Sequence, residues 1–131
     1  MPIQALSPTT YEQLIPVLKA LAEPNRLRIF NHLMQGDSCN CELGDALELA
    51  PNLLSHHLRV LSKAGLVQAR RDSIDKRWIY YAVAIAQVDT IRAMLHDLFD
   101  TTRCDPRPQL CGPEGQLAAA ICATEATAIP E

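Results

Sequence analysis

The residues best suited to chemistry are five cysteines: Cys39, Cys41, Cys104, Cys111 and Cys122. An odd number of cysteines argues against a disulfide framework and leaves thiols available as ligands. Cys39 and Cys41 form a Cys-x-Cys pair where we expect a short helix to begin, and a helix N-terminus favours ionisation of thiols. Two thiolates so close repel each other unless a soft cation or metalloid neutralises them. Two packing residues, or chance, would produce the same pair.

A basic segment is the second chemical feature. The whole chain has a net charge of −3, but residues 55–81 hold six basic residues against two acidic ones, which makes this segment +4 and the remainder −7. A local basic stripe suits phosphate binding even in an acidic protein. The alternative is an ordinary solvated surface.

Four helices are expected to position these residues. Ser7 and Pro8 begin the first, and Pro16 should either kink it or delay its start. The second starts at Pro24 and ends at Gly36, and the third is short, over residues 41–47. The fourth spans 51–64 and ends at Gly65. The apolar stripe expected for the second helix consists of Leu27, Phe30, Leu33 and Met34.

An extended segment from residue 66 and the strand formers at 78–83 predict a β-hairpin, with the polar, basic residues 70–77 at its tip. A fifth helix is expected over 86–102. The chain after Arg103 has four prolines and no aromatic residue, so we expect a loosely ordered tail with a short helix near 116–122. These elements predict a mainly α fold, a winged helix-turn-helix in residues 1–102, followed by a tail over 103–131.

The fourth helix has two faces. Leu54, Leu58 and Leu61 form an apolar seam, while hydrogen-bonding and cationic residues occupy the other side. A major groove admits one helix of this kind, braced by the helix before it. The predicted DNA-binding residues are Asn52, Ser55, His56, Arg59 and Lys63 on the helix, with Lys76 and Arg77 on the hairpin. His57 flanks the seam and suits packing at least as well as a DNA contact.

Four segments resemble the ArsR/SmtB family of metal-responsive repressors. They are LKALAEPNRLRIFNHL (18–33), SCNCELGDAL (38–47), NLLSHHLRVLSKAGLV (52–67) and RRDSIDKRWIYYAV (70–83). The resemblance covers roughly residues 10 to 100. It implies a homodimer built on the first and last helices, which binds double-stranded operator DNA and releases it when a metal or metalloid binds.

The arsenic-sensing form of this family carries a Cys-x-Cys-x-x-Cys pattern, but here Gly44 stands at the third position. A three-thiolate site then needs a ligand from elsewhere; Cys104 is the first choice, Cys111 follows closely, and Cys122 is expected to be a packing or spectator thiol. The expected inducer is trivalent arsenic or antimony, with Cd(II), Pb(II) or another soft ion as the alternative. If only Cys39 and Cys41 bind, a methylated trivalent arsenical fits.

Three other interpretations remain. A zinc site between paired fifth helices is disfavoured, because Ile91 stands where a histidine is needed beside Asp89, His96 and Asp97. A redox-sensing repressor of the same fold would instead form a disulfide. A small thiol-dependent enzyme would need an anion loop or a nucleophile–base pair, and neither is evident, so we expect no enzyme. Without a membrane span or a secretory leader, the expected location is the cytoplasm.

Overall fold

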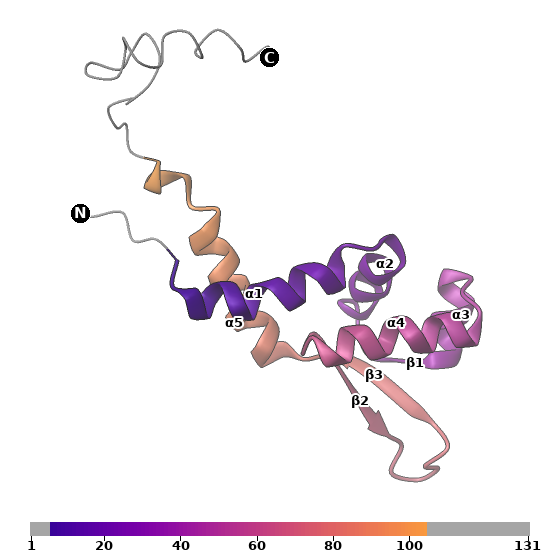
Figure 1. The fold of residues 1–131 in the computed structure, drawn as a ribbon. Coiled ribbons are helices and arrows are strands. Elements are labelled where there is room, and N and C mark those ends of the chain that lie inside the picture. The colour runs from indigo at the N-terminus through magenta and orange to yellow at the C-terminus, as the bar shows by residue number, and fades with distance from the viewer. Residues whose placement is uncertain (1–5, 105–131) are drawn as a thin grey trace, which may run out of the picture. The chain divides into compact units, whose positions relative to one another are not determined.

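The computed structural model describes residues 6–104 (Figure 1). Contacts divide the chain into two units, residues 1–99 and 100–131. The first unit holds five helices and a three-stranded antiparallel sheet. Its elements are α1 (Pro8–Leu21), α2 (Pro24–Leu33), β1 (Ser38–Cys39), α3 (Asn40–Leu47), α4 (Pro51–Lys63), β2 (Val67–Arg71), β3 (Ile79–Val83) and α5 (Ile85–Leu98). The predicted fold class, mainly helical with a β-hairpin wing, is confirmed.

Local capping signals explain where the first helices begin. The Ser7 hydroxyl accepts a hydrogen bond from the Thr10 amide (3.2 Å) at the start of α1, and the Glu23 carboxylate accepts one from the Arg26 amide (2.9 Å) at the start of α2. Each cap precedes a proline at the first helical position. Helix α1 continues through Pro16, so the predicted later start is wrong. Proline removes one N–H from the helix but does not end it here.

The core lies where α1, α2, α3 and α4 meet the base of the sheet. The predicted seam of α4 is confirmed, since Leu54, Leu58 and Leu61 are all buried. The stripe predicted for α2 is partly wrong, because Leu27 and Met34 are exposed and Ile29 is buried with Leu33. Helix α2 packs against α1, α3, α4 and β3, and these neighbours select the face centred on Ile29.

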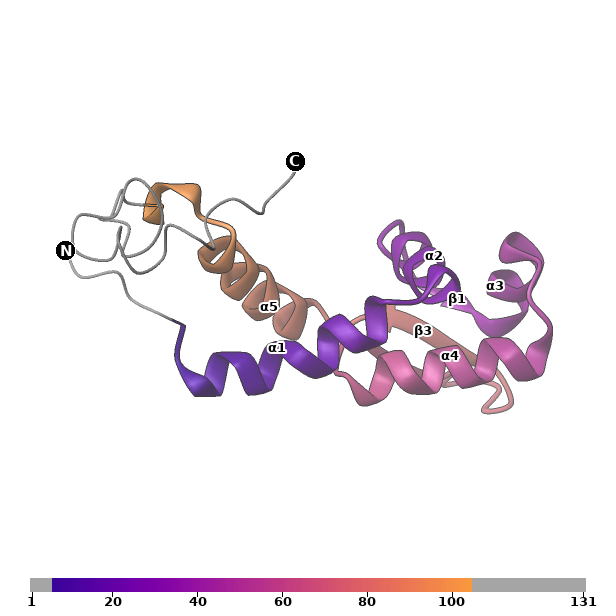
Figure 2. The same ribbon diagram turned by 45° about the horizontal axis from the view of Figure 1, so that its top comes forward.

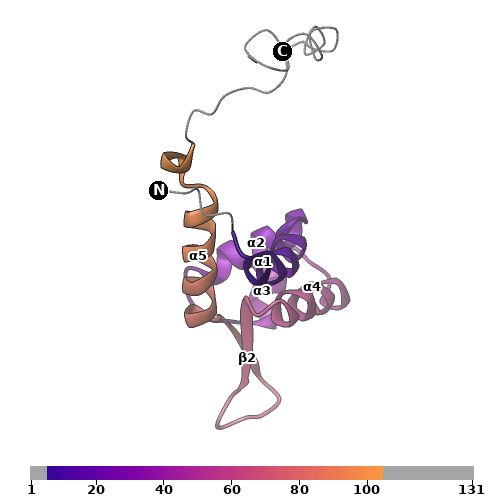
Figure 3. The same ribbon diagram turned by 60° about the vertical axis from the view of Figure 1, so that its left-hand side comes forward.

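Strand β3 is the centre of the sheet, with β1 on one side and β2 on the other. The hairpin of β2 and β3 extends away from the helices (Figure 3). Strand β1, only two residues long, was not predicted. Helix α5 packs beside α1 (Figure 2) and ends at Leu98 rather than at residue 102. In the second unit, residues Thr101–Arg103 form a separate 3-10 turn, whose Thr102 amide donates to the Asp100 carboxylate (3.0 Å).

The described helices are too short or too polar to cross a membrane.

Candidate nucleic-acid interface and thiol site

Helix α4 presents the predicted DNA-reading side chains on its exposed face. All five residues assigned to it (Asn52, Ser55, His56, Arg59 and Lys63) are exposed, opposite the buried leucine seam. Pro51 begins the helix, and Gly65, with φ +81°, turns the chain from α4 into the hairpin. A positive φ is free of strain for glycine, which explains the sharp exit there.

Helix α3 braces α4 through a tight turn. Glu48 adopts a left-handed conformation (φ 55°), and the Leu49 amide donates to the Gly44 carbonyl (3.0 Å). A Cβ atom on Gly44 would lie 3.3 Å from the Leu49 carbonyl oxygen, so a side chain at this position would crowd the turn. The Arg28 guanidinium also donates to the Leu47 carbonyl (3.0 Å), which ties α2 to the end of α3. The position of α3 therefore determines where α4 begins.

His57 anchors the buried side of α4 and is not a DNA-facing residue. It is 5 % exposed, its Nδ1 lies 3.2 Å from an Arg26 guanidinium nitrogen, and Glu23 Oε2 is 3.7 Å away. Burial lowers the pKa of His57, and the Arg26 charge acts in the same direction, while Glu23 opposes them. Neutral Nδ1 can then accept from Arg26, which also donates to the Ala20 carbonyl (2.6 Å). Arg26, in α2, contacts Ala20 of α1 and His57 of α4. Because 31 positions separate Arg26 from His57, local sequence patterns did not reveal this contact.

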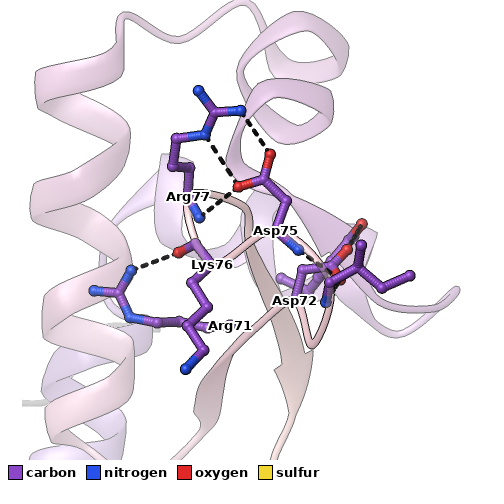
Figure 4. Close-up of polar contacts among 7 residues, drawn as sticks. Arg71, Asp72, Asp75, Lys76 and Arg77 are labelled. Carbon is purple, nitrogen blue, oxygen red and sulfur yellow. Dashed lines mark hydrogen bonds and ion pairs between the residues drawn. The ribbon is translucent and has the colours of Figure 1, made fainter.

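The wing loop is organised by two aspartates (Figure 4). Asp72 accepts hydrogen bonds from the amides of Ile74 (2.7 Å) and Asp75 (3.5 Å), and the Ile74 bond is the main cause of its lowered pKa. Asp75 binds the Arg77 guanidinium at 2.8 and 3.0 Å, and this hydrogen bonding lowers the pKa of Asp75. Both predicted wing cations, Lys76 and Arg77, are exposed, but Arg77 is already paired.

The Cys-x-Cys pair lies at the N-terminus of α3, as predicted. Cys39 is the N-cap, and its Sγ accepts a hydrogen bond from the Glu42 amide (3.5 Å). Cys39 is 4 % exposed, whereas Cys41 is exposed. Sulfur is a soft ligand, which suits thiophilic ions better than magnesium or calcium. The two sulfurs are soft donors, and the accessible Cys41 gives a thiophilic ion a point of entry.

The predicted third ligand belongs to another part of the chain. Cys104 is exposed and belongs to the second unit, where its amide donates to the Thr101 carbonyl (3.0 Å). Cys111 and Cys122, with the short helix expected at 116–122, lie outside the described residues. Among residues 6–104 no group of three histidine, cysteine or acidic side chains is arranged to hold a metal ion. The three-thiolate site stays a prediction.

Helix α1 carries a second apolar face. Leu14, Val17 and Ala20 are buried in the core, while Tyr11, Ile15 and Leu18 are 47 %, 49 % and 44 % exposed. These three residues follow the i, i+4, i+7 spacing of a single helical face.

Comparison with known proteins identifies the family. Residues 23–69 match the family described as bacterial regulatory protein, arsR family. An uncharacterised HTH-type transcriptional regulator of Methanocaldococcus jannaschii is 34 % identical over 67 % of this chain and 97 % of its own length. An arsenical resistance operon repressor of Staphylococcus aureus is 35 % identical over 53 % of this chain and 65 % of its own. A homologue of a cadmium resistance regulatory protein, also from Staphylococcus aureus, is 30 % identical over 61 % and 66 %.

A solved structure agrees with the fold. The homodimeric winged helix-turn-helix DNA-binding domain of a possible ArsR-family regulator from Mycobacterium bovis is 29 % identical, with a TM-score of 0.57. The match covers 78 % of this chain and 93 % of that one. The chain belongs to the arsR family of bacterial regulatory proteins, which are DNA-binding transcriptional regulators and not enzymes.

Proposed function

We propose that this protein is a homodimeric repressor that binds a two-fold operator and releases it when trivalent arsenic or antimony binds its cysteine thiolates. The observation that carries the proposal is the Cys39–Cys41 pair at the N-terminus of α3, the helix that braces the DNA-facing helix α4. A ligand at this pair lies one helix away from the DNA-reading surface. Cd(II) and Pb(II) are the alternative inducers.

DNA binding is assigned to α4 and the wing. The side chains on the open face of α4 can donate to base edges and phosphates. Lys76 adds positive charge at the wing, and we assign Arg77 there as well, although Asp75 pairs with it. Base contacts are assigned to the middle of the helix, at Ser55 and Arg59. Phosphate contacts are assigned to the wing, where flexible cations suit a backbone that is uniform in charge.

The second copy of the chain is expected to cover the exposed face of α1. Tyr11, Ile15 and Leu18 would leave an apolar strip in water in a monomer, and α5 lies beside α1 so that both helices can join one interface. The structural relative from Mycobacterium bovis is homodimeric, which supports a homodimer here. A two-fold axis through this interface places two α4 helices on successive major grooves.

The donor set fits a thiophilic ion. Cys39 and Cys41 offer two sulfurs, and we assign the third to Cys104 or Cys111, from the same subunit or its partner. The ion can drive release only if it binds the DNA-free form more tightly than the DNA-bound form. The Cys39 sulfur accepts the Glu42 amide at the start of α3, so we expect a ligand on this sulfur to shift the start of α3 and, through the Leu49–Gly44 turn, the placement of α4.

An anaerobic titration tests this proposal. Arsenite, Cd(II) and Zn(II) are added separately to the reduced protein bound to a fluorescent duplex, which is first selected from random DNA by the apo-protein. We expect arsenite to release the duplex and Zn(II) to leave it bound. Release by Cd(II) alone would replace arsenic with the alternative inducer, and release by a thiol oxidant alone would make the protein a redox sensor.

Serine variants locate the ligands, because serine resembles cysteine in size and binds soft ions poorly. Cys39→Ser and Cys41→Ser should bind the duplex and ignore arsenite, and Cys122→Ser should respond as the wild type does. Of Cys104→Ser and Cys111→Ser, the variant that loses release identifies the third thiolate. If both respond normally, the site has two thiolates. If the Cys39 and Cys41 variants also respond, the proposed site is wrong.

A further inference from the structure

One row of residues crosses the whole sheet and begins at the thiol pair. Cys39 in β1 pairs with Tyr80 in β3, and Tyr80 pairs with Arg70 in β2. Residues directly opposite each other on neighbouring antiparallel strands place their side chains on the same face. The row therefore brings Cys39, the Tyr80 ring and the Arg70 guanidinium together, although 41 positions separate Cys39 from Tyr80 in the sequence.

The Tyr80 hydroxyl links this row to the wing loop. It donates to Asp72 Oδ2 (3.2 Å), while the other oxygen of Asp72 accepts the amides of Ile74 and Asp75. Asp75 in turn holds Arg77. A displacement of Tyr80 therefore moves or releases the Asp72 carboxylate, which shapes the loop that carries Lys76 and Arg77.

The Arg70 side chain holds the Tyr80 ring from the opposite strand. Its guanidinium lies over the ring, 4.7 Å from the ring centre, and pairs with Asp37 at 3.7 Å, two residues before Cys39. Both ends of that ion pair are about half exposed, so we assign it a geometric role rather than a large energy. Arg70 therefore connects the Tyr80 ring in β3 to the residues that precede Cys39.

We propose that Tyr80 is a positioning residue that couples the thiol pair to the wing, so that inducer binding at Cys39 displaces the wing loop as well as α3. The inference rests on the proposed function, because it takes Cys39 and Cys41 as the inducer site. The electrostatics agree with this arrangement. The pKa of Tyr80 is raised by burial, then by its hydrogen bond to Asp72, and also by the charges of Asp72 and Cys39. The phenol therefore stays protonated and can donate to Asp72.

The chain contains its own reporter for this coupling. Trp78 is the only tryptophan, and it closes the wing loop: its carbonyl accepts from the Asp72 amide (2.9 Å) and its amide donates to the Asp75 carbonyl (3.0 Å). Trp78 emission therefore reports the loop that Asp72 organises. A change of that emission on adding arsenite, without DNA, measures whether the thiol pair and the wing are connected.

The test compares Tyr80→Phe with Tyr81→Phe in the full chain. Tyr80→Phe keeps the ring and removes only the hydroxyl that binds Asp72. Tyr81 is the matched control, because it belongs to the neighbouring row, opposite Ser38 and Ala69, and packs against the hydrophobic core. Arsenite affinity is measured by competition with a chromophoric thiol reagent, wing response by Trp78 emission, and release by duplex anisotropy with and without arsenite.

We expect Tyr80→Phe to bind arsenite as the wild type does and to lose the Trp78 response. Arsenite should also weaken duplex binding less in this variant: the factor by which it lowers the affinity should be about two- to thirtyfold smaller than in the wild type. Tyr81→Phe should retain all three wild-type behaviours. Asp72→Asn, which leaves the tyrosine in place, should also shrink the Trp78 response, and it serves as the test if Tyr80→Phe does not fold by circular dichroism.

Two failures are distinguishable. If Tyr80→Phe and Asp72→Asn both keep the full Trp78 response and the full release, the wing is not coupled through Tyr80, and the proposed function stands. If neither arsenite nor Cd(II) binds the wild-type thiol pair, the proposed function and the coupling both fail.

Discussion

Replacing Lys76 with alanine should reduce the salt dependence of DNA binding by a calculable amount. Each phosphate neutralised by a cation contributes about 0.9 to the slope of log affinity against log salt concentration. The ion pairs found among residues 6–104 do not involve the Lys76 side chain, so its full charge is available. A dimer carries two copies, and Lys76→Ala should lower the slope by about 1.8. When the salt concentration rises from about 50 to about 200 mM, the factor by which DNA affinity falls should then be about tenfold smaller for the variant than for the wild type.

Asp75 supplies a control of opposite sign. Its carboxylate neutralises Arg77, and Arg77 lowers the Asp75 pKa by hydrogen bonding, so the pair has no net charge at neutral pH. Asp75→Asn frees Arg77 and should steepen the slope by up to about 1.8. Arg92, an exposed side chain on α5 that pairs with Asp89, is the neutral control, and Arg92→Ala should leave the slope unchanged.

The assay is fluorescence anisotropy of a selected duplex and of a random duplex over a salt series. Phosphate contacts carry no sequence information, so the slope should change equally for both duplexes. If Lys76→Ala has the wild-type slope, or if Asp75→Asn flattens it, the wing does not lie on the phosphate backbone as assigned.

Three further outcomes follow from burial and charge. Leu61→Ala, at a fully buried position, should lower the free energy of unfolding in urea by about 2 to 5 kcal/mol, whereas Leu53→Ala at the exposed position should cost far less. Because the pKa of His57 is lowered in the folded protein, the unfolded chain binds more protons than the folded chain just below pH 6.5. The free energy of unfolding should therefore fall as the pH drops through that window, and His57→Asn should flatten this part of its pH profile. Ile15→Asp should turn a dimer into a monomer in sedimentation; a wild-type monomer at micromolar concentration would refute the assigned interface.

Much of the fold could be predicted because its determinants are local. Ser7, Pro24 and Pro51 begin helices whatever surrounds them, and Gly65 ends one through its own backbone freedom. The buried leucine seam of α4 could be predicted from the helical spacing of its residues alone. The end of α5 was predicted less well, because its apolar residues continue to Phe99 although the helix ends at Leu98.

The positions of the candidate site residues on their elements could be predicted from the sequence, but their contacts with distant residues could not. Cys39 was expected at the start of a helix, but it also belongs to strand β1, which forms by pairing with Tyr80 in β3. Because 41 positions separate the two residues, this pairing leaves no local sequence pattern. His57 was ambiguous for the same reason, since its burial depends on Arg26 reaching it from α2. The contribution of Cys104 or Cys111 to the inducer site remains a prediction.

Gly44 bears on how a sensor of this kind can change over evolutionary time. The familiar third cysteine of the arsenic pattern would stand at this position, where a Cβ atom meets the Leu49 carbonyl at 3.3 Å and a Leu54 methyl at 3.7 Å. A single codon change to cysteine would therefore gain a sulfur and strain the turn that sets α4. To accept that side chain, the Leu49 carbonyl must move by a few tenths of an ångström. A third thiolate supplied from elsewhere in the chain, as proposed for Cys104 or Cys111, would leave this turn unchanged.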